Sequence, residues 1–307
     1  MFQSRRLLGY LLVVCTLCAV SRLVYAFGVP PTPKRKDSPT PPGSGGRIVK
    51  PVKQRTPRAV SSSSPEPLLP ATPGAESRNE KAGIDLVEIR AGWFNMGSPK
   101  GIGDADEYPR HKVYLDTYRI AKTEVTVSQF RKYCEASGYS YDWNGQKPSW
   151  GYVDDYPMVN VDWDEAKAYC AWAGGDLPTE AEWEKAAKGT DGRGYPWTGG
   201  WDAAKCVNGS NSGGHPASVG SKSGDRSPYG VEDMGGNVWE WCKDRYDSAY
   251  YSRSPKRNPQ GNNNGTDRVL RGGSWLNVNP DDFRCALRYW YFPTSWYSNN
   301  GFRPVFH

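Results

Sequence analysis

The aromatic residues and glycines of this chain are concentrated in its C-terminal part, and this distribution constrains the fold more than any other feature. All 13 tryptophans and most of the 19 tyrosines and 34 glycines lie beyond Gly83. Apolar runs there are short, and turns of Gly, Asn, Ser and Pro recur every few residues, which favours brief strands, loops and aromatic packing. A length of 307 residues allows one large domain with appendages. We therefore predict one globular domain of the α+β class over residues 83–307.

Residues 27–82 are rich in proline and serine, with almost no aromatic residues and no apolar period. Such a segment cannot bury enough apolar surface to offset its ordering entropy, so we predict a disordered, basic, Pro/Ser-rich tether. A spacer is the expected role, with a binding motif or contact with an anionic envelope as alternatives. The first 82 residues hold 13 of the 39 basic and 4 of the 33 acidic residues, which leaves a slightly acidic domain. That composition gives no basic face for a nucleic-acid partner.

Residues 1–26 are typical of an export signal. Arg5 and Arg6 precede a short apolar run, and Arg22 and a small-residue site at VYAF follow it, which suggests a twin-arginine route. The run is short for a permanent membrane span, so removal or lipid attachment is expected. Cys15 and Cys18 are candidate lipid sites, so membrane association through this segment stays open. We expect an exported protein, periplasmic or at the cell surface.

Three helices are predicted from capping boxes, in which a capping side chain is followed three residues later by Glu or Gln. The boxes pair Thr126 with Gln129, Asp162 with Glu165, and Thr179 with Glu182. The second helix ends at Gly174 and Gly175 and the third at Gly189, because glycine readily adopts the left-handed conformation that closes helices. Earlier in the domain, LVEIRAGWFNMGS alternates apolar and polar residues around a glycine, which indicates a hairpin.

Several segments, in this order and spacing, resemble the sulfatase-modifying-factor family, that of the formylglycine-generating enzyme. They are FNMGS, EVTVSQFRKYC, PMVNVDWDEAKAYCAWAGGDLPTEAEWEKAAKG, YPWTGG, SPYGVEDMGGNVWEWCKD, RVLRGGSW and GFRPV. The resemblance covers residues 86–305, nearly the whole predicted domain. It implies a variant of the C-type-lectin-like fold with little regular secondary structure.

The resemblance breaks at the enzymes' catalytic site. In those enzymes two cysteines between the GGS and RCA elements bind copper and oxidise a target cysteine with oxygen. Here the first position is Asn277, and the second falls at or near Asp281 and Asp282. None of these side chains can supply a thiolate, the nucleophile and soft-metal ligand that this chemistry needs. We expect no copper and no oxidation by that route.

An iron-dependent branch of the family holds its metal with a histidine cluster instead. The three histidines here, at positions 111, 215 and 307, are scattered and lack ligand spacing. We therefore expect surface or loop histidines rather than a metal site.

The resemblance also implies a disulfide. Cys285 keeps its place in the RCA element and Cys170 lies in AYCAWAG, two elements that the family joins by a bridge. Export to an oxidising compartment agrees with that pairing, and a pair of buried free thiols is the alternative. Cys134, Cys206 and Cys242 have no assigned partner.

DMGGNVWEW resembles the calcium loop of the family. Carried over position by position, the ligands are the Asp233 side chain, the Gly236 and Val238 carbonyls and the Glu240 carboxylate. Oxygen-only ligation suits a hard cation such as calcium. The alternative is that Glu240 only caps a turn packed by neighbouring tryptophans. The family's other ion site, near Asn208, lacks the expected acid.

A non-catalytic branch of the family consists of the variable proteins of diversity-generating retroelements. Their template resembles GGSWNNN, RxANR, asparagine-rich stretches and GFR, and adenine-specific mutagenesis rewrites its Asn codons and some Arg codons. In the present chain, the residues that fit such rewriting, here named the rewritable positions, are Leu276, Val278, Asp282, Leu287, Tyr289, Trp290, Tyr291, Phe292, Thr294, Ser295, Trp296, Tyr297 and Ser298. The residues that match the fixed frame are Gly272, Gly273, Ser274, Trp275, Arg284, Ala286, Arg288, Pro293, Gly301, Phe302 and Arg303.

The rewritable positions together with Asn277 form the predicted ligand surface, here named the recognition segment, residues 276–298. RYWYFPTSWYS is dense in Tyr, Trp and hydroxyl residues, which give large contact areas at low entropic cost. The alternative is that these aromatics belong to the core. We expect an exported, non-enzymatic protein that binds an unidentified protein or glycan. Two alternatives remain: a protein-modifying oxidase of the formylglycine-generating type, and a static envelope partner module.

Overall fold

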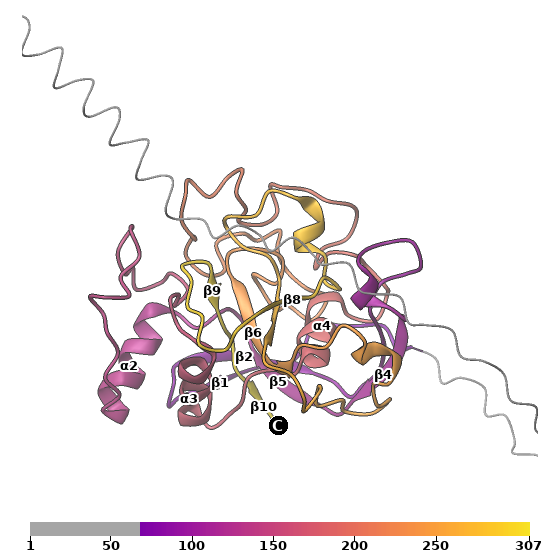
Figure 1. Cartoon of the computed structure of the whole chain (residues 1–307), viewed down its shortest axis with the longest axis horizontal. Helices are drawn as coiled ribbons and strands as arrows, with labels where there is room; N and C mark the ends of the chain where they lie inside the picture. The colour runs from indigo at the N-terminus through magenta and orange to yellow at the C-terminus, as the bar shows by residue number, and fades with distance from the viewer. Residues whose placement is uncertain (1–67) are drawn as a thin grey trace, which may run out of the picture. The chain divides into compact units, whose positions relative to one another are not determined.

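The structure is a computed structural model that describes residues 68–307; the predicted export signal and most of the predicted tether lie outside these residues. In chain order its elements are β1 (Glu76–Asn79), β2 (Ile84–Ile89), β3 (Gly92–Met96), η1 (Ala105–Glu107), β4 (His111–Leu115), β5 (Tyr118–Ala121), α2 (Val127–Ser137), α3 (Trp163–Ala173), α4 (Glu180–Lys188), β6 (Trp239–Arg245), η2 (Tyr250–Ser252), β7 (Arg268–Arg271), η3 (Pro280–Phe283), β8 (Tyr289–Tyr291), β9 (Asn300–Gly301) and β10 (Val305–Phe306) (Figure 1). Within the described part of the chain, no helix has the length and apolar character needed to cross a bilayer.

All three predicted helices form, and each begins at its predicted capping box. Thr126, Asp162 and Thr179 each accept a hydrogen bond from the backbone of the residue three positions on. Gly174 closes α3 in the left-handed conformation, with φ +88°. Long stretches between α4 and β6 are loops and turns, as the dense turn residues there predict. The α+β class is therefore confirmed.

Three sheets carry the domain. The first has the strand order β1-β2-β5-β10, the second pairs β3 with β4, and the third has the order β8-β7-β6-β9. The predicted hairpin region becomes β2 and β3, but these strands belong to different sheets because β2 pairs with β1 and β5. In the third sheet β9 runs parallel to β6, and β7 joins β6 to β8.

The domain begins earlier than predicted. Residues 76–79, assigned to the tether, form β1 and pair antiparallel with β2. Gly74 donates its backbone N–H to the carbonyl of Tyr229, which ties the chain before β1 to the domain as well. These residues lack an apolar period because β1 is an edge strand whose side chains are mostly exposed, so burial leaves no mark on their sequence.

Two large hydrophobic clusters fill the interior. One includes Phe130 of α2 and Tyr169 of α3, whose rings stack with centroids 5.9 Å apart. The other includes Trp183 of α4 and strand residues from the second sheet. Strand β6 contributes Trp241 to the first cluster and Cys242 to the second, since successive strand residues point to opposite faces. The third sheet thus lies at the junction of the two clusters and supports the recognition segment.

The predicted Cys170–Cys285 disulfide is not formed. Both cysteines are buried free thiols, and so are Cys206 and Cys242, while Cys134 is a half-buried free thiol. Cys170 packs in the first cluster and Cys285 in the second, so the two side chains belong to different parts of the core. Burial raises the pKa of Cys285 to about 12, which makes this thiol a poor nucleophile.

Candidate functional site

The two positions where the enzymes keep cysteines lie side by side. Asn277 Nδ2 donates a hydrogen bond to Asp282 Oδ2 at 2.8 Å, and Ser274 Oγ donates to Asn277 Oδ1 at 2.6 Å. Of the two acids at or near the second position, Asp282 makes this contact, while its neighbour Asp281 is exposed and contacts Arg284. An amide and a carboxylate form a hydrogen-bonded pair there, without the sulfur that copper and oxygen chemistry requires.

Burial separates the fixed frame of the C-terminal region from the rewritable positions. Ten of the eleven fixed-frame residues are buried, and Pro293 is half-buried. Of the thirteen rewritable positions, twelve are exposed or half-buried, and Leu287 is the exception. The rewritable positions rest on the template resemblance and codon changes, which take no account of burial, and they coincide with exposed or half-buried residues at all but one position.

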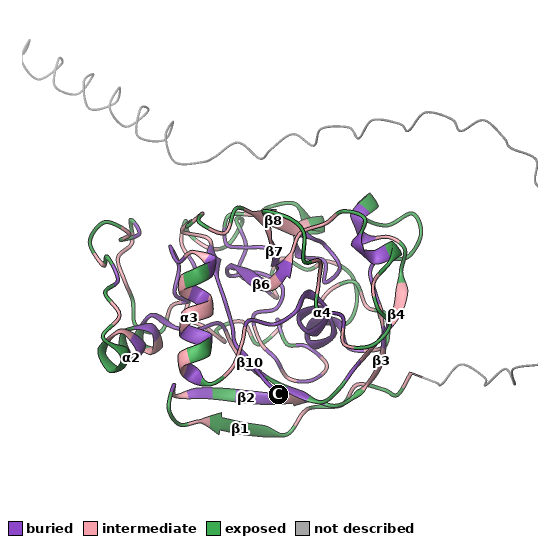
Figure 2. Cartoon of the chain, turned by 60° about the horizontal axis from the view of Figure 1, so that its bottom comes forward, coloured by how far each residue is buried: buried purple, intermediate pink, exposed green. Residues whose placement is uncertain are grey.

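The recognition segment presents apolar side chains to solvent. Seven large hydrophobic residues are exposed in the described part of the chain, and four of them, Leu276, Val278, Phe292 and Trp296, lie in this segment. In Figure 2, β8 lies at the upper surface of the domain, on the side opposite β1 and β2. A monomer seldom exposes several large apolar side chains from one short segment unless they serve contact with a partner.

The three aromatic side chains of β8 point in two opposite directions. Tyr289 stacks on Trp239 with ring centroids 5.1 Å apart, and Tyr291 packs against Tyr297 at 4.7 Å. Trp290 points the other way and packs on Tyr246. This follows from the alternation of side chains along a strand, and it means that Trp290 does not join the tyrosines in one contact surface.

Leu287 is not a surface residue, contrary to its place in the predicted ligand surface. Its side chain is 8% exposed and belongs to the first hydrophobic cluster. Its carbonyl accepts a hydrogen bond from Arg271, which fixes the backbone before β8. A ligand on the surface therefore contacts the residues that cover Leu287 and not the Leu287 side chain itself.

Hydrogen bonds to backbone carbonyls attach the loop after β8 to the domain. Trp275 Nε1 donates to the Ser298 carbonyl at 3.0 Å, and the Asn160 N–H donates to the Tyr297 carbonyl at 3.1 Å. The Trp163 N–H at the start of α3 donates to the Pro293 carbonyl at 2.9 Å. The bonds use carbonyls of the loop, so they hold its course whatever side chains the loop carries.

Three buried fixed-frame arginines hold the C-terminal region from inside, two within the recognition segment and one just after it. Arg284, Arg288 and Arg303 are buried and form salt bridges with Glu107, Glu180 and Glu240, respectively. Burial acts to raise the pKa of Glu107, but hydrogen bonds from Arg284 and the backbone hold that pKa below its usual value. Paired charge-assisted hydrogen bonds between a guanidinium and a carboxylate fix the orientation of both groups. The Arg284 and Arg288 pairs therefore hold the middle of the recognition segment, and the Arg303 pair holds the chain just after it.

The predicted calcium ligands lie in a buried acidic region that the sequence only partly indicates. Asp233 and Glu240 are buried, as predicted ligands should be, but both Glu240 oxygens accept hydrogen bonds from Arg303 at 2.7 and 2.8 Å. Glu124 and Asp225 are buried close by, and the pKa of each is raised well above its usual value, first by burial and then by the charge of Asp233.

The donor set of this region fits an oxygen-ligated cation at Asp233 rather than at Glu240. Among residues 68–307, no donor group bonds to either buried carboxylate oxygen of Glu124, and the Asp233 carboxylate is the acidic neighbour with which it interacts. Such an arrangement is costly unless a proton or a cation compensates it. No three acidic, histidine or cysteine side chains converge on a common point in the described residues. A bound ion would thus need backbone carbonyls, as in the expected set with Gly236 and Val238. The sequence signal that could have identified Glu124 is its place as the acidic residue of TEVT, residues 123–126, directly before α2.

The three histidines contact different parts of the domain. His111 packs against Tyr251, His215 stacks on Tyr156, and His307 Nε2 lies 2.7 Å from Glu182. They do not form a cluster of metal ligands.

Fold and site together define a loop-rich, C-type-lectin-like domain of the formylglycine-generating type whose catalytic positions carry an amide and a carboxylate. Residues 72–307 match the family model described as the sulfatase-modifying factor enzyme 1-like domain. The chain therefore belongs to the sulfatase-modifying factor family.

Similar proteins include both enzymes and a variable protein. The formylglycine-generating enzyme of Streptomyces coelicolor is 32% identical over 296 residues, covering 78% of this chain and 94% of that enzyme. The structure of PvdO from Pseudomonas aeruginosa aligns with a TM-score of 0.68 and 26% identity, covering 77% of this chain and 99% of that one. Treponema denticola variable protein 1 aligns with a TM-score of 0.62 and 25% identity, covering 76% and 98%.

Proposed function

We propose that this chain is a non-enzymatic ligand-binding protein whose recognition segment, a product of retroelement diversification, forms the contact surface. The observation that carries the proposal is the burial pattern: nearly all fixed-frame residues are buried, and all but one of the rewritable positions reach the surface. A contact surface that changes while its support stays constant needs this division. The likeness to a Treponema variable protein supports the same function.

The chemistry of the surface suits a protein or glycan ligand. Phe292 and Trp296 are 58% and 47% exposed, and Thr294 is exposed between them. Aromatic side chains of this kind are frequent among the residues that dominate binding energy, and hydroxyls add adaptable hydrogen bonds. The rewritable positions include one ionisable acid, Asp282, which is already bonded to Asn277. Affinity would thus come from apolar burial and neutral hydrogen bonds rather than from charge.

We also propose a structural calcium ion and export. Asp233, with the carbonyls of Gly236 and Val238, would hold the ion, and Glu124 would stabilise it through its oxygens, which lack a donor among the described residues. Calcium would supply charge compensation for the buried carboxylates.

Arg5 and Arg6 suggest passage through a twin-arginine route to the periplasm or cell surface.

An oxidase assay separates this function from the family's catalytic one. We expect the purified full-length protein, supplied with copper(I), a cysteine-containing peptide and oxygen, to consume oxygen no faster than copper and peptide without protein, and to form no aldehyde. The physical reason is the Asn277–Asp282 pair, which replaces two thiolates with an amide and a carboxylate. The Streptomyces enzyme, assayed in parallel, is the positive control. Aldehyde formation or oxygen consumption above the background of copper and peptide without protein would contradict a non-enzymatic role.

A further inference from the structure

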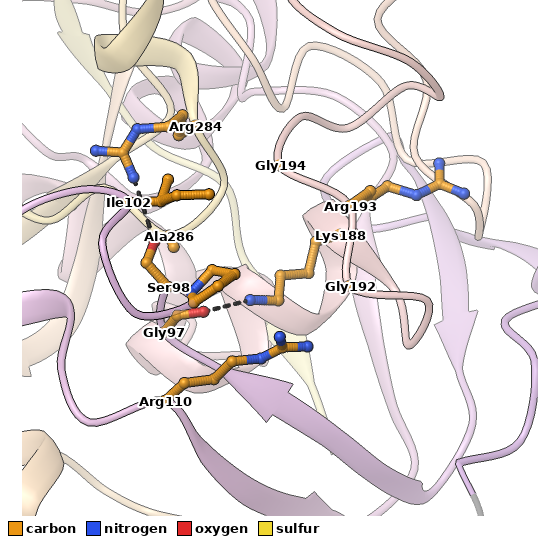
Figure 3. Close-up of a pocket in the computed structure, with 11 residues that line it drawn as sticks. Gly97, Ser98, Ile102, Arg110, Lys188, Gly192, Arg193, Gly194, Arg284 and Ala286 are labelled. Carbon is orange, nitrogen blue, oxygen red and sulfur yellow. Dashed lines mark hydrogen bonds between the residues drawn. The ribbon is translucent and has the colours of Figure 1, made fainter.

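A small cavity lies beside the recognition segment but uses none of its rewritable positions. Its volume is about 120 Å³, and its lining includes Gly97 and Ser98 after β3, Arg110 before β4, Lys188 at the end of α4, and Arg284 (Figure 3). Of the residues between 276 and 298, only the fixed-frame Arg284 and Ala286 line it. The cavity therefore keeps the same walls whatever the recognition segment becomes.

The walls of this cavity are cationic. Four basic residues and no acidic residue line it, although Arg193 bonds to Asp191 and the Pro196 carbonyl and points away from the others (Figure 3). Lys188 is 3% exposed, and its Nζ donates to the Gly97 carbonyl and to Glu184 Oε1. A lysine ammonium has three N–H donors, so one remains available.

One of the four cations that line the cavity, Arg110, has no carboxylate partner among residues 68–307. The other three are paired, Arg284 with Glu107, Lys188 with Glu184 and Arg193 with Asp191. Glu184 is shared between Lys188 and Arg271, each with an N···O distance of 2.6 Å. Arg110 is exposed, and its guanidinium has no hydrogen-bond or ion-pair partner among the described residues. It lies close to Gly192, where the Cβ of any larger residue would lie 3.1 Å from Arg110 Nη2. The glycine thus leaves room for the guanidinium at the mouth of the cavity.

We propose that this cavity binds one oxyanionic group, a sulfate, phosphate or carboxylate, with Arg110 and Lys188 as its cationic donors. The volume is well below the roughly 300 Å³ of a small-molecule pocket, so it suits a single anionic group rather than a whole ligand. Planar guanidinium groups favour oxyanions through paired charge-assisted hydrogen bonds. The bound group is either a free inorganic anion or the acidic end of a larger molecule such as a sugar acid.

Calorimetric titration of the purified full-length protein tests this site. Sodium sulfate and sodium glucuronate are each titrated at constant ionic strength maintained with sodium chloride. We expect saturable binding of at least one of them, weakened about tenfold in Arg110→Gln, which corresponds to about 1.4 kcal/mol, and lost in Arg110→Glu. Arg119→Gln, which removes another exposed arginine without a partner on β5, should bind as the unchanged protein does.

The two anions also distinguish the source of the group. Tighter binding of glucuronate assigns the cavity to the acidic end of a larger ligand, and equal or tighter binding of sulfate assigns it to a free anion. Either result supports the site if Arg110→Glu abolishes it. The absence of saturable binding, or equal binding by the unchanged protein and Arg110→Glu, would overturn it. Because Phe292 and Trp296 do not line the cavity, the outcome is independent of the proposed recognition surface.

Discussion

Replacing Arg303 with methionine is expected to destabilise the domain by about 3 to 5 kcal/mol, enough to unfold much of the protein at 37 °C. Arg303 is fully buried, and its five N–H groups make six hydrogen-bond contacts, two with Glu240 and four with backbone carbonyls. Methionine fills similar space but leaves the Glu240 carboxylate uncompensated in a region already crowded with Asp233 and Glu124. Urea unfolding followed by tryptophan fluorescence measures the loss.

Two further variants test whether the loss of stability in Arg303→Met comes from the buried salt bridge. Adding Glu240→Gln to Arg303→Met should recover about 1 to 2 kcal/mol, because it removes the stranded charge. The double variant Phe292→Ser with Trp296→Ser should change the free energy of unfolding by about 0.5 kcal/mol or less, since both side chains are largely exposed. A surface variant as destabilising as Arg303→Met would show that the recognition segment is part of the core.

Calcium is expected to raise the melting temperature by about 5 to 10 °C over a chelated sample. A ligand at one hundred times its dissociation constant stabilises the folded state by about 2.7 kcal/mol, and a domain of this size shifts by about 2 to 4 °C per kcal/mol. Calcium would stabilise the fold because it compensates the excess of buried carboxylates around Arg303, including the Glu124 oxygens that lack a hydrogen-bond donor among the described residues. Thermal unfolding in EDTA, in calcium and in magnesium measures the shift.

Glu124→Gln separates calcium binding from general salt effects. The raised pKa of Glu124 favours its neutral form in the chelated protein, so glutamine should change the stability of the chelated protein little. It should reduce the calcium response by more than half, because a glutamine cannot become a carboxylate when calcium binds. Glu88→Gln, a change on β2 away from the acidic region, should alter neither quantity. Equal melting temperatures in EDTA and calcium, with no effect of Glu124→Gln, would show that the acidic region binds no calcium.

The local elements of this fold are largely readable from the sequence because short-range rules determine them. The boxes at Thr126, Asp162 and Thr179 fix where the helices begin, and Gly174 fixes where α3 ends. The spacing of the flanking elements places Asn277 and the acidic pair Asp281 and Asp282 at the altered site, and the structure shows that Asp282 is the acid that contacts Asn277. Beyond these, the order of strands in the sheets depends on long-range pairing, such as β9 beside β6, that no local pattern encodes.

The disulfide prediction came from the family pattern, whereas the predictions for Leu287 and residues 76–79 were wrong because burial, or exposure at a sheet edge, depends on distant segments that a short sequence window does not contain. Cys170 and Cys285 lie in different hydrophobic clusters, although the family pattern pairs them. Leu287 is covered by the first cluster, and the edge strand β1 carries no apolar period. The burial of Glu124 in the acidic region likewise results from packing across the domain.

Sequencing the DNA that flanks this gene tests the proposed diversification most directly. We expect a near-copy of codons 272–303 beside a reverse-transcriptase gene, with every mismatch at an adenine of the copy. The mismatches should fall at the positions that reach the surface, together with Leu287, and should spare the buried frame from Gly272 to Arg303. The absence of such a copy, or mismatches at other bases and at buried frame codons, would contradict diversification and leave a static binding protein.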